Sequence, residues 1–281
     1  MDSATPHIEA ALSFIADAGS YAAHYIYPLS SGRQNKRPQQ EFKTVSIHDA
    51  RQLSTPPSLD EKGFQLITSA TNTRDFYDEE AVRRDYYPEV IRLLKQALGA
   101  KEVIVFDHNQ RSVKRAKAGQ PGVRLPAESA HVDYTPTSGP RRAREVLYEA
   151  DMSVYACHRM ALINVWRPII GPVQDFPIAV CDPCSSTEND YVQTDIHHFN
   201  EDDLENPQLS GQIYSLRYNP SQRWYYCPEM STQESLLLRN WDSAVTDHSC
   251  FAAHTGFKNP FCPSDITPRE SIEVRTLVIF P

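Results

Sequence analysis

The second half of the chain is patterned as a series of short strands. From residue 130 onward, apolar or alternating runs are separated by Pro, Asn, Asp and Ser. Short runs bounded by turn-forming residues are typical of β-strands. We expect strands at 163–169, 178–181, 213–218, 223–227, 236–238, 249–254 and 271–280, with one helix at 141–156. Many short strands with few helices predict an α+β, mainly β fold, a sandwich or barrel packed with helices.

The middle of the first half is patterned as a long helix followed by a strand. Apolar residues recur at helical spacing over 78–98, and Gly99 stands where a helix commonly ends. Pro88 lies inside this segment and predicts a kink or a break, because proline lacks the backbone donor. The β-branched run 102–107 predicts a buried strand.

Residues 1–40 are predicted to form an N-terminal arm or lid, and residues 41–281 the main domain. A short helical pattern at 8–18 precedes a polar, proline-containing passage at 30–40, and a strand is expected at 42–47. The composition of the first 40 residues is equally compatible with a lid, with an arm that joins two copies into a homodimer, and with a disordered tail.

Composition and charge exclude several classes of function. The 281 residues carry 28 Lys+Arg against 36 Asp+Glu, a formal net charge of -8. This balance argues against nucleic-acid binding, because neutralising phosphates requires a dense basic face. The basic stretches 33–37, 111–117 and 141–144 are interpreted as solvated faces. No run approaches the roughly 18 apolar residues of a membrane span, and without a basic leader the expected location is the cytoplasm.

Cysteine usage indicates reduced thiols. Six cysteines in a chain of this length are too sparse for a disulfide scaffold. Cys181 and Cys184 form a single CxxC pair, without the second pair that a zinc site of this type needs. We interpret both as structural thiols.

The most informative polar pattern is His131-Val132-Asp133. Residues two apart on a strand point to the same face, so an imidazole and a carboxylate would converge on one ion. A facial triad of two histidines and one carboxylate needs one more histidine and leaves three positions of the metal open. Because the tripeptide also arises by chance in a chain with ten histidines, it is weak evidence when taken alone.

His254 is the favoured third ligand. It ends an apolar stretch, and its small neighbours would let a metal approach closely. His248 is the main alternative. The other histidines considered stand in an acidic loop or at a helix end, which favours surface or structural roles: His197, His198 and His158.

The last predicted strand places polar and charged side chains on the face that points into the domain. Arg269, Ser271, Glu273 and Arg275 alternate before the chain turns apolar. A buried guanidinium needs a partner, and a dicarboxylate co-substrate offers the planar, bidentate one that arginine fits best. The alternative is a surface ion pair between Arg275 and Glu273 on an exposed edge strand.

These motifs resemble a known family. His131-x-Asp133, a distal His254 and Arg269-x-Ser271 are similar to the pattern of the Fe(II)/2-oxoglutarate-dependent oxygenases. More narrowly, a string of motifs over about residues 40–281 resembles the fungal gibberellin-desaturase and cephalosporin-methoxylase-like branch: NVWRP at 164–168, GPVQD at 171–175, QRWYY at 222–226, DS at 242–243, AHT at 253–255 and RESIEVR at 269–275. The ordered string is far more specific than the tripeptide alone.

The resemblance implies a fold and roles for single residues. The fold would be a double-stranded β-helix (jelly-roll, cupin-like) core flanked by helices. Arg269 would bind the distal carboxylate of 2-oxoglutarate, with Ser271 as a supporting donor. Arg275 is a second candidate for that carboxylate or for an acidic group of the substrate, and spacing does not separate the two arginines. The iron ligands would be His131, Asp133 and His254.

Four further residues are candidates for the same pocket. Asn164 and Arg167 would line it beside the co-substrate, but strand alternation puts Asn164 and Trp166 on one face and Arg167 on the other. Tryptophans such as Trp166 are more often core than site. Tyr134 follows a ligand, so its ring should face away unless the strand bends; Tyr134 and Trp166 are kept as substrate contacts.

The implied activity is that of an oxidoreductase, a dioxygenase that uses Fe(II), 2-oxoglutarate and dioxygen. Its substrate would be a small-molecule intermediate of fungal secondary metabolism, changed by hydroxylation, desaturation or cyclisation. Two alternatives stay open. One is a zinc-dependent hydrolase with the same His/Asp/His set, which leaves Arg269 unexplained. The other is a non-catalytic β-helix module that binds a small molecule.

Overall fold

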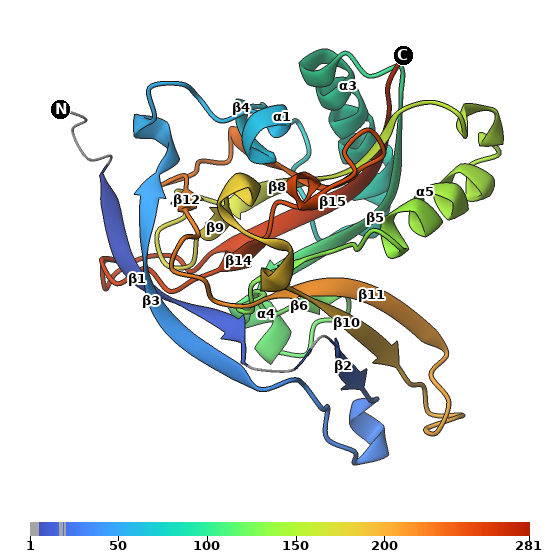
Figure 1. Ribbon diagram of the computed structural model, residues 1–281, viewed down its shortest axis with the longest axis horizontal. Helices are drawn as coiled ribbons and strands as arrows, with labels where there is room; N and C mark the ends of the chain where they lie inside the picture. The colour runs from blue at the N-terminus through green and yellow to red at the C-terminus, as the bar shows by residue number, and fades with distance from the viewer. Residues whose placement is uncertain (1–5, 17–18, 20) are drawn as a thin grey trace.

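Two β-sheets face each other across the main core (Figure 1). The computed structural model describes residues 6–16, 19 and 21–281, without the side chains of Leu29 and His248. The larger sheet has nine strands, in the order β1 (His7–Ile15), β3 (Gln40–Asp49), β12 (Trp224–Tyr226), β9 (Ile178–Cys181), β14 (His254–Gly256), β7 (His131–Val132), β11 (Leu209–Leu216), β10 (Tyr191–His198) and β2 (Tyr21–Ile26). The smaller sheet has six, in the order β4 (Phe64–Thr68), β13 (Glu234–Asp242), β8 (Met160–Ile170), β15 (Glu270–Ile279), β5 (Glu102–Ser112) and β6 (Val123–Arg124).

Helices flank these sheets. One continuous helical stretch packs beside β5, and it consists of α2 (Glu79–Ala81), the π-helical segment η3 (Val82–Tyr86) and α3 (Tyr87–Leu98) (Figure 1). A second helix, α5 (Ser138–Glu149), contacts β8 and β11. The other helical segments are short: α1 (Leu59–Lys62), α4 (Val113–Lys117), η1 (Leu29–Ser31), η2 (Ala50–Gln52), η4 (Ser153–Tyr155), η5 (Pro183–Ser185), η6 (Glu188–Asp190) and η7 (His248–Cys250).

Alternation along β15 separates two apolar clusters. Leu277 and Ile279 belong to the core between the sheets. Ile272 and Val274 belong to a second cluster, which packs under α3 on the other side of the small sheet. Since successive side chains of a strand point to opposite faces, the odd-numbered residues of β15 face the interior between the sheets. This alternation therefore also places the odd-numbered polar residues of β15 on the inner face, where the site lies.

Most of the predicted elements are confirmed. The expected strands at 42–47, 102–107, 163–169, 178–181, 213–218, 223–227, 236–238 and 271–280 correspond to β3, β5, β8, β9, β11, β12, β13 and β15. The helical stretch 78–98 is interrupted as Pro88 predicts, since Pro88 lies in the first turn of α3 directly after the π-helical segment. Gly99 ends α3 with a left-handed φ of 64°.

The helix expected at 8–18 is wrong. Residues 7–15 form β1, which pairs antiparallel with β3 along its whole length. Ala10, Leu12 and Phe14 are buried on one face, a period of two. Helix propensity is a weak prior, and the pairing with β3 outweighs the Ala and Glu residues that gave the segment its helical appearance.

Three boundaries near the later strands also need correction. The strand expected at 249–254 is wrong, because η7 ends at Cys250 and β14 begins only at His254. The helix expected at 141–156 stops at Glu149, where Asp151 turns the chain with a φ of 56°. His197 and His198 belong to β10 and not to a loop.

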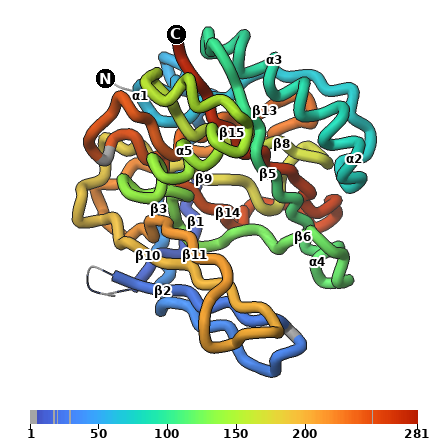
Figure 2. The backbone as a smooth tube through the Cα atoms, turned by 90° about the vertical axis from the view of Figure 1, so that its right-hand side faces the viewer, coloured from blue at the N-terminus to red at the C-terminus, as the bar shows by residue number. Residues whose placement is uncertain are grey.

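The first 40 residues contribute strands to the large sheet. β1 and β2 occupy its two edges. β2 pairs in parallel with β10, from Tyr21 opposite Gln193 to Ile26 opposite His198. Figure 2 shows β2, β10 and β11 extending together away from the rest of the molecule.

Candidate metal centre and co-substrate pocket

Two neighbouring strands of the large sheet bring the three predicted ligands together. His131 lies on β7, Asp133 directly follows that strand, and His254 begins β14. His254 is the cross-strand partner of His131, and the centroids of the two imidazole rings are 4.7 Å apart. One ligand atom from each of the three residues lies within 4.8 Å of the others. The spacing of the sequence motif and the pairing of β7 with β14 therefore bring the three side chains together around one point.

The two imidazoles are oriented by backbone carbonyls. His131 Nδ1 lies 2.8 Å from the carbonyl oxygen of Ser129, and His254 Nδ1 lies 3.1 Å from that of Ala252. We assign the proton of each ring to Nδ1, because a carbonyl oxygen can only accept. Burial, followed by the charge of His131, lowers the pKa of His254. Both Nε2 atoms are thus available as metal-binding lone pairs.

Asp133 is held in its ionised form by polar neighbours. Its Oδ2 accepts a hydrogen bond from Asn164 Nδ2 at 2.8 Å and lies 3.3 Å from Arg275 Nε. Its Oδ1 lies 3.5 Å from His131 Nε2. Burial alone would raise the pKa of Asp133, but the charge of Arg275 holds it well below its usual value. Two neutral imidazoles and one carboxylate fit the donor set of a facial iron site.

Arg269 is buried without an acidic partner. It is 3% exposed, and its one guanidinium hydrogen bond within the described residues goes from Nη1 to the carbonyl of Phe176 at 2.6 Å. Its Nε has no partner in that part of the chain, and no carboxylate oxygen there lies within 4.0 Å of the guanidinium. Burial and the nearby charge of Arg111 lower the pKa of Arg269 to about 9.

Arg275 is paired, in contrast. Its guanidinium lies 3.2 Å from Asp107, 3.3 Å from Asp133 and 3.7 Å from Glu273. Burial alone would lower the pKa of Arg275, but Asp133 and Glu273 together raise it. The two arginines that spacing could not separate are therefore electrostatically different, since only Arg269 lacks a carboxylate.

A narrow pocket joins the predicted ligands to Arg269. Trp166 forms part of its apolar wall, and the centroid of its ring lies 5.3 Å from the Arg269 guanidinium carbon. Gly256 allows a close approach, because a Cβ there would lie 2.4 Å from the ring of Phe176. The pocket is lined by Arg111, Ala127, His131, Trp166, Ile178, His254, Thr255, Gly256, Arg269 and Glu273.

Similarity to known proteins decides the family. A family model described as "Oxidoreductase/YMDC permease-like domain" matches residues 12–279. The hydroxylase/desaturase efuI of Hormonema carpetanum is 30% identical, over 98% of this chain and 96% of its own length. The Fe(II)/2-oxoglutarate-dependent dioxygenase nvfI of Aspergillus novofumigatus is 32% identical, over 83% of this chain and 82% of its own. A solved structure of the iron and alpha-ketoglutarate-dependent endoperoxidase NvfI matches with a TM-score of 0.83 at 29% identity, covering 99% of both chains.

The chain belongs to this oxidoreductase family and is an Fe(II)/2-oxoglutarate-dependent oxygenase. Its cofactor is Fe(II) and its co-substrates are 2-oxoglutarate and dioxygen. The predicted double-stranded β-helix is confirmed by the structural neighbours. The zinc hydrolase and the non-catalytic binding module do not agree with these relatives. Among the described residues, no helix is both long enough and apolar enough to cross a membrane.

Three of the candidate site residues do not line the pocket. Arg167 points to the opposite face of the small sheet, where its guanidinium binds Tyr86 Oη and two segments of backbone. It must therefore be removed from the residues expected to line the co-substrate site. Tyr134 lies beyond the end of β7 and packs in part against the core between the sheets. Asn164 faces the interior, but it contacts Asp133 and not the pocket surface.

The remaining histidines differ from the three ligands. His158 Nδ1 lies 3.2 Å from the carbonyl of Phe280, and His197 Nδ1 lies 3.0 Å from Ser210 Oγ. The side chain of His248 lies outside the described residues.

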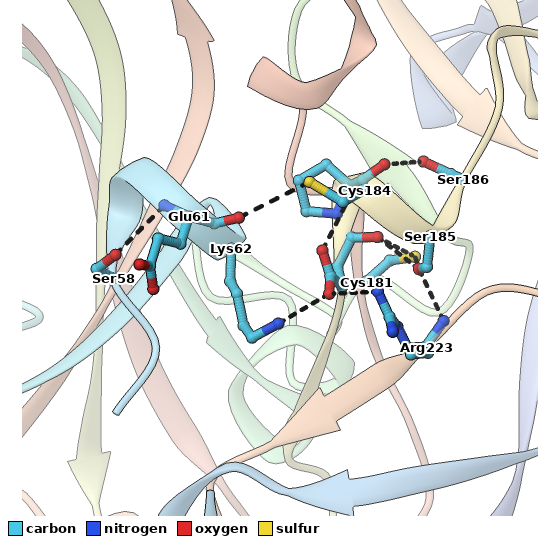
Figure 3. Close-up of polar contacts among 10 residues, drawn as sticks. Ser58, Glu61, Lys62, Cys181, Cys184, Ser185, Ser186 and Arg223 are labelled. Atoms are coloured by element: carbon cyan, nitrogen blue, oxygen red, sulfur yellow. Dashed lines mark hydrogen bonds and ion pairs between the residues drawn. The ribbon is translucent and has the colours of Figure 1, made fainter. Parts of the chain in front are cut away.

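The CxxC pair has a structural environment. Asp182, between the two cysteines, is buried and lies 2.9 Å from Lys62 Nζ and 3.2 Å from Arg223 Nη2. Figure 3 shows Lys62 and Arg223 beside Cys181 and Cys184. Within the described residues neither sulfur joins a group of metal-binding side chains, and all six cysteines are free. Reduced, structural thiols stay a prediction.

Sequence reasoning missed two charged residues of the pocket. Arg111 was assigned to a solvated face, and Glu273 was placed on the inward face of the last strand but was given no role in the pocket. The signal for both is strand parity. β5 extends to Ser112, so Arg111 lies opposite Ser271 and Glu273 lies opposite Asn109 on the inner face.

Proposed function

We propose that the oxygenase holds its iron through His131, Asp133 and His254. The support is the convergence of their ligand atoms together with the hydrogen bonds that orient each ring. Such outer partners fix the tautomer and direct the metal-binding lone pair. Asn164 and Arg275 hold Oδ2 of Asp133, which leaves Oδ1 for the metal.

Arg269 binds the distal carboxylate of 2-oxoglutarate in this proposal. The observation that carries the assignment is a buried guanidinium with one hydrogen bond and no carboxylate partner in the described part of the chain. Ser271 supports it, because its Oγ is also buried and without a partner there. A dicarboxylate entering the pocket satisfies both groups. Arg275 already has acidic partners and acts on Asp133.

The protein contributes placement and exclusion of water to the reaction. Bound iron supplies the oxidising chemistry, in which 2-oxoglutarate is decarboxylated to succinate and carbon dioxide and a C–H bond of the substrate is oxidised. Arg269 fixes the far end of the keto acid. The apolar side chains of Trp166 and Ile178 keep water away from the reacting end.

The substrate in our proposal is a small organic intermediate of fungal secondary metabolism. Relatives named as hydroxylase/desaturase, and an aspirochlorine biosynthesis protein of Aspergillus oryzae that is 35% identical over 56% of this chain, support that class. The motifs at 164–168 and 269–275 favour the gibberellin-desaturase and cephalosporin-methoxylase-like branch. Trp166 in the pocket wall and Tyr134 beside Asp133 are the proposed substrate contacts.

In this proposal, residues 1–40 form an arm and residues 41–281 form the oxygenase domain. The support is the position of β1 and β2 at the two edges of the large sheet, where β2 pairs in parallel with β10. A homodimer and a cytoplasmic location stay predictions.

The test compares Arg269→Lys with Arg275→Lys. Under anaerobic conditions, 2-oxoglutarate is titrated into the Fe(II)-loaded protein and followed by the visible charge-transfer band of a chelated keto acid. Arg269→Lys should weaken 2-oxoglutarate binding by about 1.5–3 kcal/mol, the contribution of a hydrogen bond to a charged group, and leave iron binding intact. Arg275→Lys should mainly weaken iron binding. An unchanged 2-oxoglutarate affinity in Arg269→Lys would move the assignment to Arg275.

A further inference from the structure

The face of the large sheet that carries His131 continues beyond the metal centre. In the sheet, β7 is followed by β11, β10 and β2, which extend together away from the rest of the molecule (Figure 2). Ser215 of β11 lies opposite His131, and directly opposed side chains stand on the same face of a sheet. The same face continues through Val192 and Thr194 of β10 to Ala22 of β2. These three strands therefore prolong the surface on which His131 stands.

The outer part of this surface is apolar and lacks a protein partner. We call it the three-strand face, and it consists of His24, Ile26, Ile196, His198, Leu209 and Ile213. Its three isoleucines are half-buried, yet they belong to none of the apolar clusters in the described part of the chain. Leu209 is 65% exposed. Apolar side chains in this condition mark a binding surface when they are contiguous.

The three-strand face carries no ionised group at neutral pH. Burial lowers the pKa of His24 to about 4 and also lowers that of His198, so both rings are neutral. Asp195 is the one acidic residue within the three strands. It points to the opposite face, where it accepts hydrogen bonds from Tyr21 Oη and Gln212 Nε2. The surface therefore suits an uncharged molecule, for which the two imidazoles offer hydrogen-bonding groups.

The co-substrate pocket lies on the other side of His131. In that direction β7 is followed by β14 and β9, which contribute Thr255 and Ile178 to the pocket wall. Among the described residues, none from β11, β10 or β2 lines this pocket. The bond that is oxidised must come within about 3.5 Å of the reacting group at the metal. Since 2-oxoglutarate takes the β14 side in the proposed site, the room for a second molecule lies over β11.

We propose that the three-strand face binds the body of the oxygenase's substrate, an uncharged and largely apolar organic molecule that reaches the metal from the side opposite to 2-oxoglutarate. This inference rests on the proposed function of the site. Ile213 and Ile196 contact the substrate nearest to the metal, and Ile26 and Leu209 contact its far end. Trp166, on the co-substrate side, contacts only the reacting end.

The dimensions of the surface indicate a substrate larger than 2-oxoglutarate. Neighbouring strands lie about 4.8 Å apart, so the three spacings from β7 to β2 cover about 14 Å. A fused-ring or long-chain molecule fills this length. The substrate class is therefore an extended apolar molecule whose polar groups are carbonyls or hydroxyls.

The test uses progesterone, an uncharged and mostly apolar tetracycle, as the probe. Its proton NMR signals are followed without oxygen in the presence of the protein, 2-oxoglutarate and either Zn(II) or Fe(II). Line broadening in the diamagnetic Zn(II) form gives the dissociation constant, and additional broadening in the paramagnetic Fe(II) form reports proximity to the metal. The variants are Ile196→Asn, Ile213→Asn and Ile196→Val. His197→Asn is the matched control, because His197 is the next residue of β10, is also half-buried and contacts Tyr25 on the opposite face.

The unaltered protein should bind the probe, and Fe(II) should add broadening. Ile196→Asn and Ile213→Asn should each raise the dissociation constant by about tenfold or more, because an amide is buried against an apolar molecule. Ile196→Val removes one methylene and should raise it about twofold to fourfold. His197→Asn should change it by less than about twofold. The affinity for 2-oxoglutarate, read from the visible charge-transfer band with Fe(II), should stay within about twofold in all four variants.

Several results would overturn the inference. They are no binding of progesterone to the unaltered protein, equal losses in His197→Asn and Ile196→Asn, and binding without additional broadening by Fe(II). Sedimentation velocity gives a further one, since self-association that Ile196→Asn abolishes would make the face a contact between two copies of the chain. If the Asn variants do not fold, an unchanged constant in Ile196→Val counts against the inference. In contrast, the absence of the charge-transfer band in the unaltered protein would overturn the proposed function, whatever the Zn(II) form shows for the three-strand face.

Discussion

Two arginines on opposite faces of the small sheet are buried to the same degree and have different surroundings. Arg167 is 2% exposed and Arg269 is 3% exposed. The Arg167 guanidinium donates to Tyr86 Oη at 3.0 Å, to the carbonyl of Thr232 at 2.7 Å, and to both the carbonyl and the hydroxyl of Ser69. Within the described residues, the Arg269 guanidinium has a single hydrogen bond and an Nε without a partner.

The difference separates a structural arginine from a ligand-binding one. Buried polar groups in folded proteins are nearly always hydrogen-bonded, so an incompletely bonded guanidinium requires an explanation. On the outer face, Arg167 ties the helical stretch to the sheet through Tyr86. Arg269, on the inner face, stands in a pocket with two histidines and a further arginine. The polar groups on the inner face are therefore fully hydrogen-bonded only when a ligand occupies the pocket.

The largest expected effect is on stability at Arg167. Arg167→Met would leave the hydroxyl of Tyr86 and the polar groups of Ser69 and Thr232 buried without their donor. Because each unsatisfied buried group costs about 1–3 kcal/mol, we expect the free energy of unfolding to fall by roughly 3 kcal/mol. Urea denaturation measures this. The affinity for 2-oxoglutarate should stay within about twofold. A strong loss of that affinity with unchanged stability would show that Arg167 binds the ligand and is not structural.

Arg269→Met should show the opposite pattern. Without 2-oxoglutarate, the free energy of unfolding should be unchanged or should rise by up to about 2 kcal/mol, because an unpaired buried charge is replaced by an apolar group. With Fe(II) bound, 2-oxoglutarate at 100 times its dissociation constant should stabilise the unaltered protein by about 2.7 kcal/mol. That ligand-induced stabilisation should disappear in the variant. A marked loss of stability without ligand would make Arg269 structural.

Asn164 tests whether the inner face also supports the metal. Asn164→Leu removes the donor to Oδ2 of Asp133. Loss of such an outer partner typically lowers metal affinity by about tenfold to a hundredfold. Competition for Fe(II) with a chelator of known affinity measures the change. Asn164→Asp is the companion variant, because it keeps the shape and adds a negative charge beside Asp133. Unchanged iron affinity in both would separate Asn164 from the metal centre.

Tyr86→Phe gives the smallest expected effect. It tests how much one hydrogen bond of Arg167 on the outer face contributes to stability. The change removes the oxygen that accepts from Arg167 Nε, while the ring and the remaining donors of Arg167 stay in place. We expect a loss of about 1 kcal/mol in the free energy of unfolding, the net contribution of one hydrogen bond. A thermal melt is sufficient to detect it. Iron and 2-oxoglutarate affinities should not change, and a change in either would link the two faces.

The sequence predicted the part of the site that depends on local parity. His131 and Asp133 are two residues apart, and the alternation from Arg269 to Arg275 places those side chains on one face whatever the partner strands are. His254 was found by its apolar and small neighbours, although the strand expected to end at His254 begins there. The local pattern was therefore sufficient for residue choice but not for element boundaries.

The other features of the fold and the site depend on contacts between segments that are distant in the sequence, so the local pattern could not predict them. Arg111 was misassigned because the basic run 111–117 looks like a solvated face, whereas the pairing of β5 with β15 carries the strand as far as Ser112. The helix expected at 8–18 is wrong for the same reason, since β3 supplies the partner that turns this segment into a strand. Likewise, the roles of Arg269 and Arg275 could be distinguished only after Asp107 and Asp133 were seen to meet Arg275.

The measurement that tests the central claim most directly is anaerobic titration of the metal-free protein with Fe(II) and then 2-oxoglutarate, in the unaltered chain and in His254→Ala. The matched control is His197→Ala, which removes a histidine of the same sheet outside the metal centre. We expect a visible charge-transfer band that needs both additions, that persists in His197→Ala and that is lost in His254→Ala. A band of full intensity in His254→Ala, or its absence from the unaltered protein, would contradict the account.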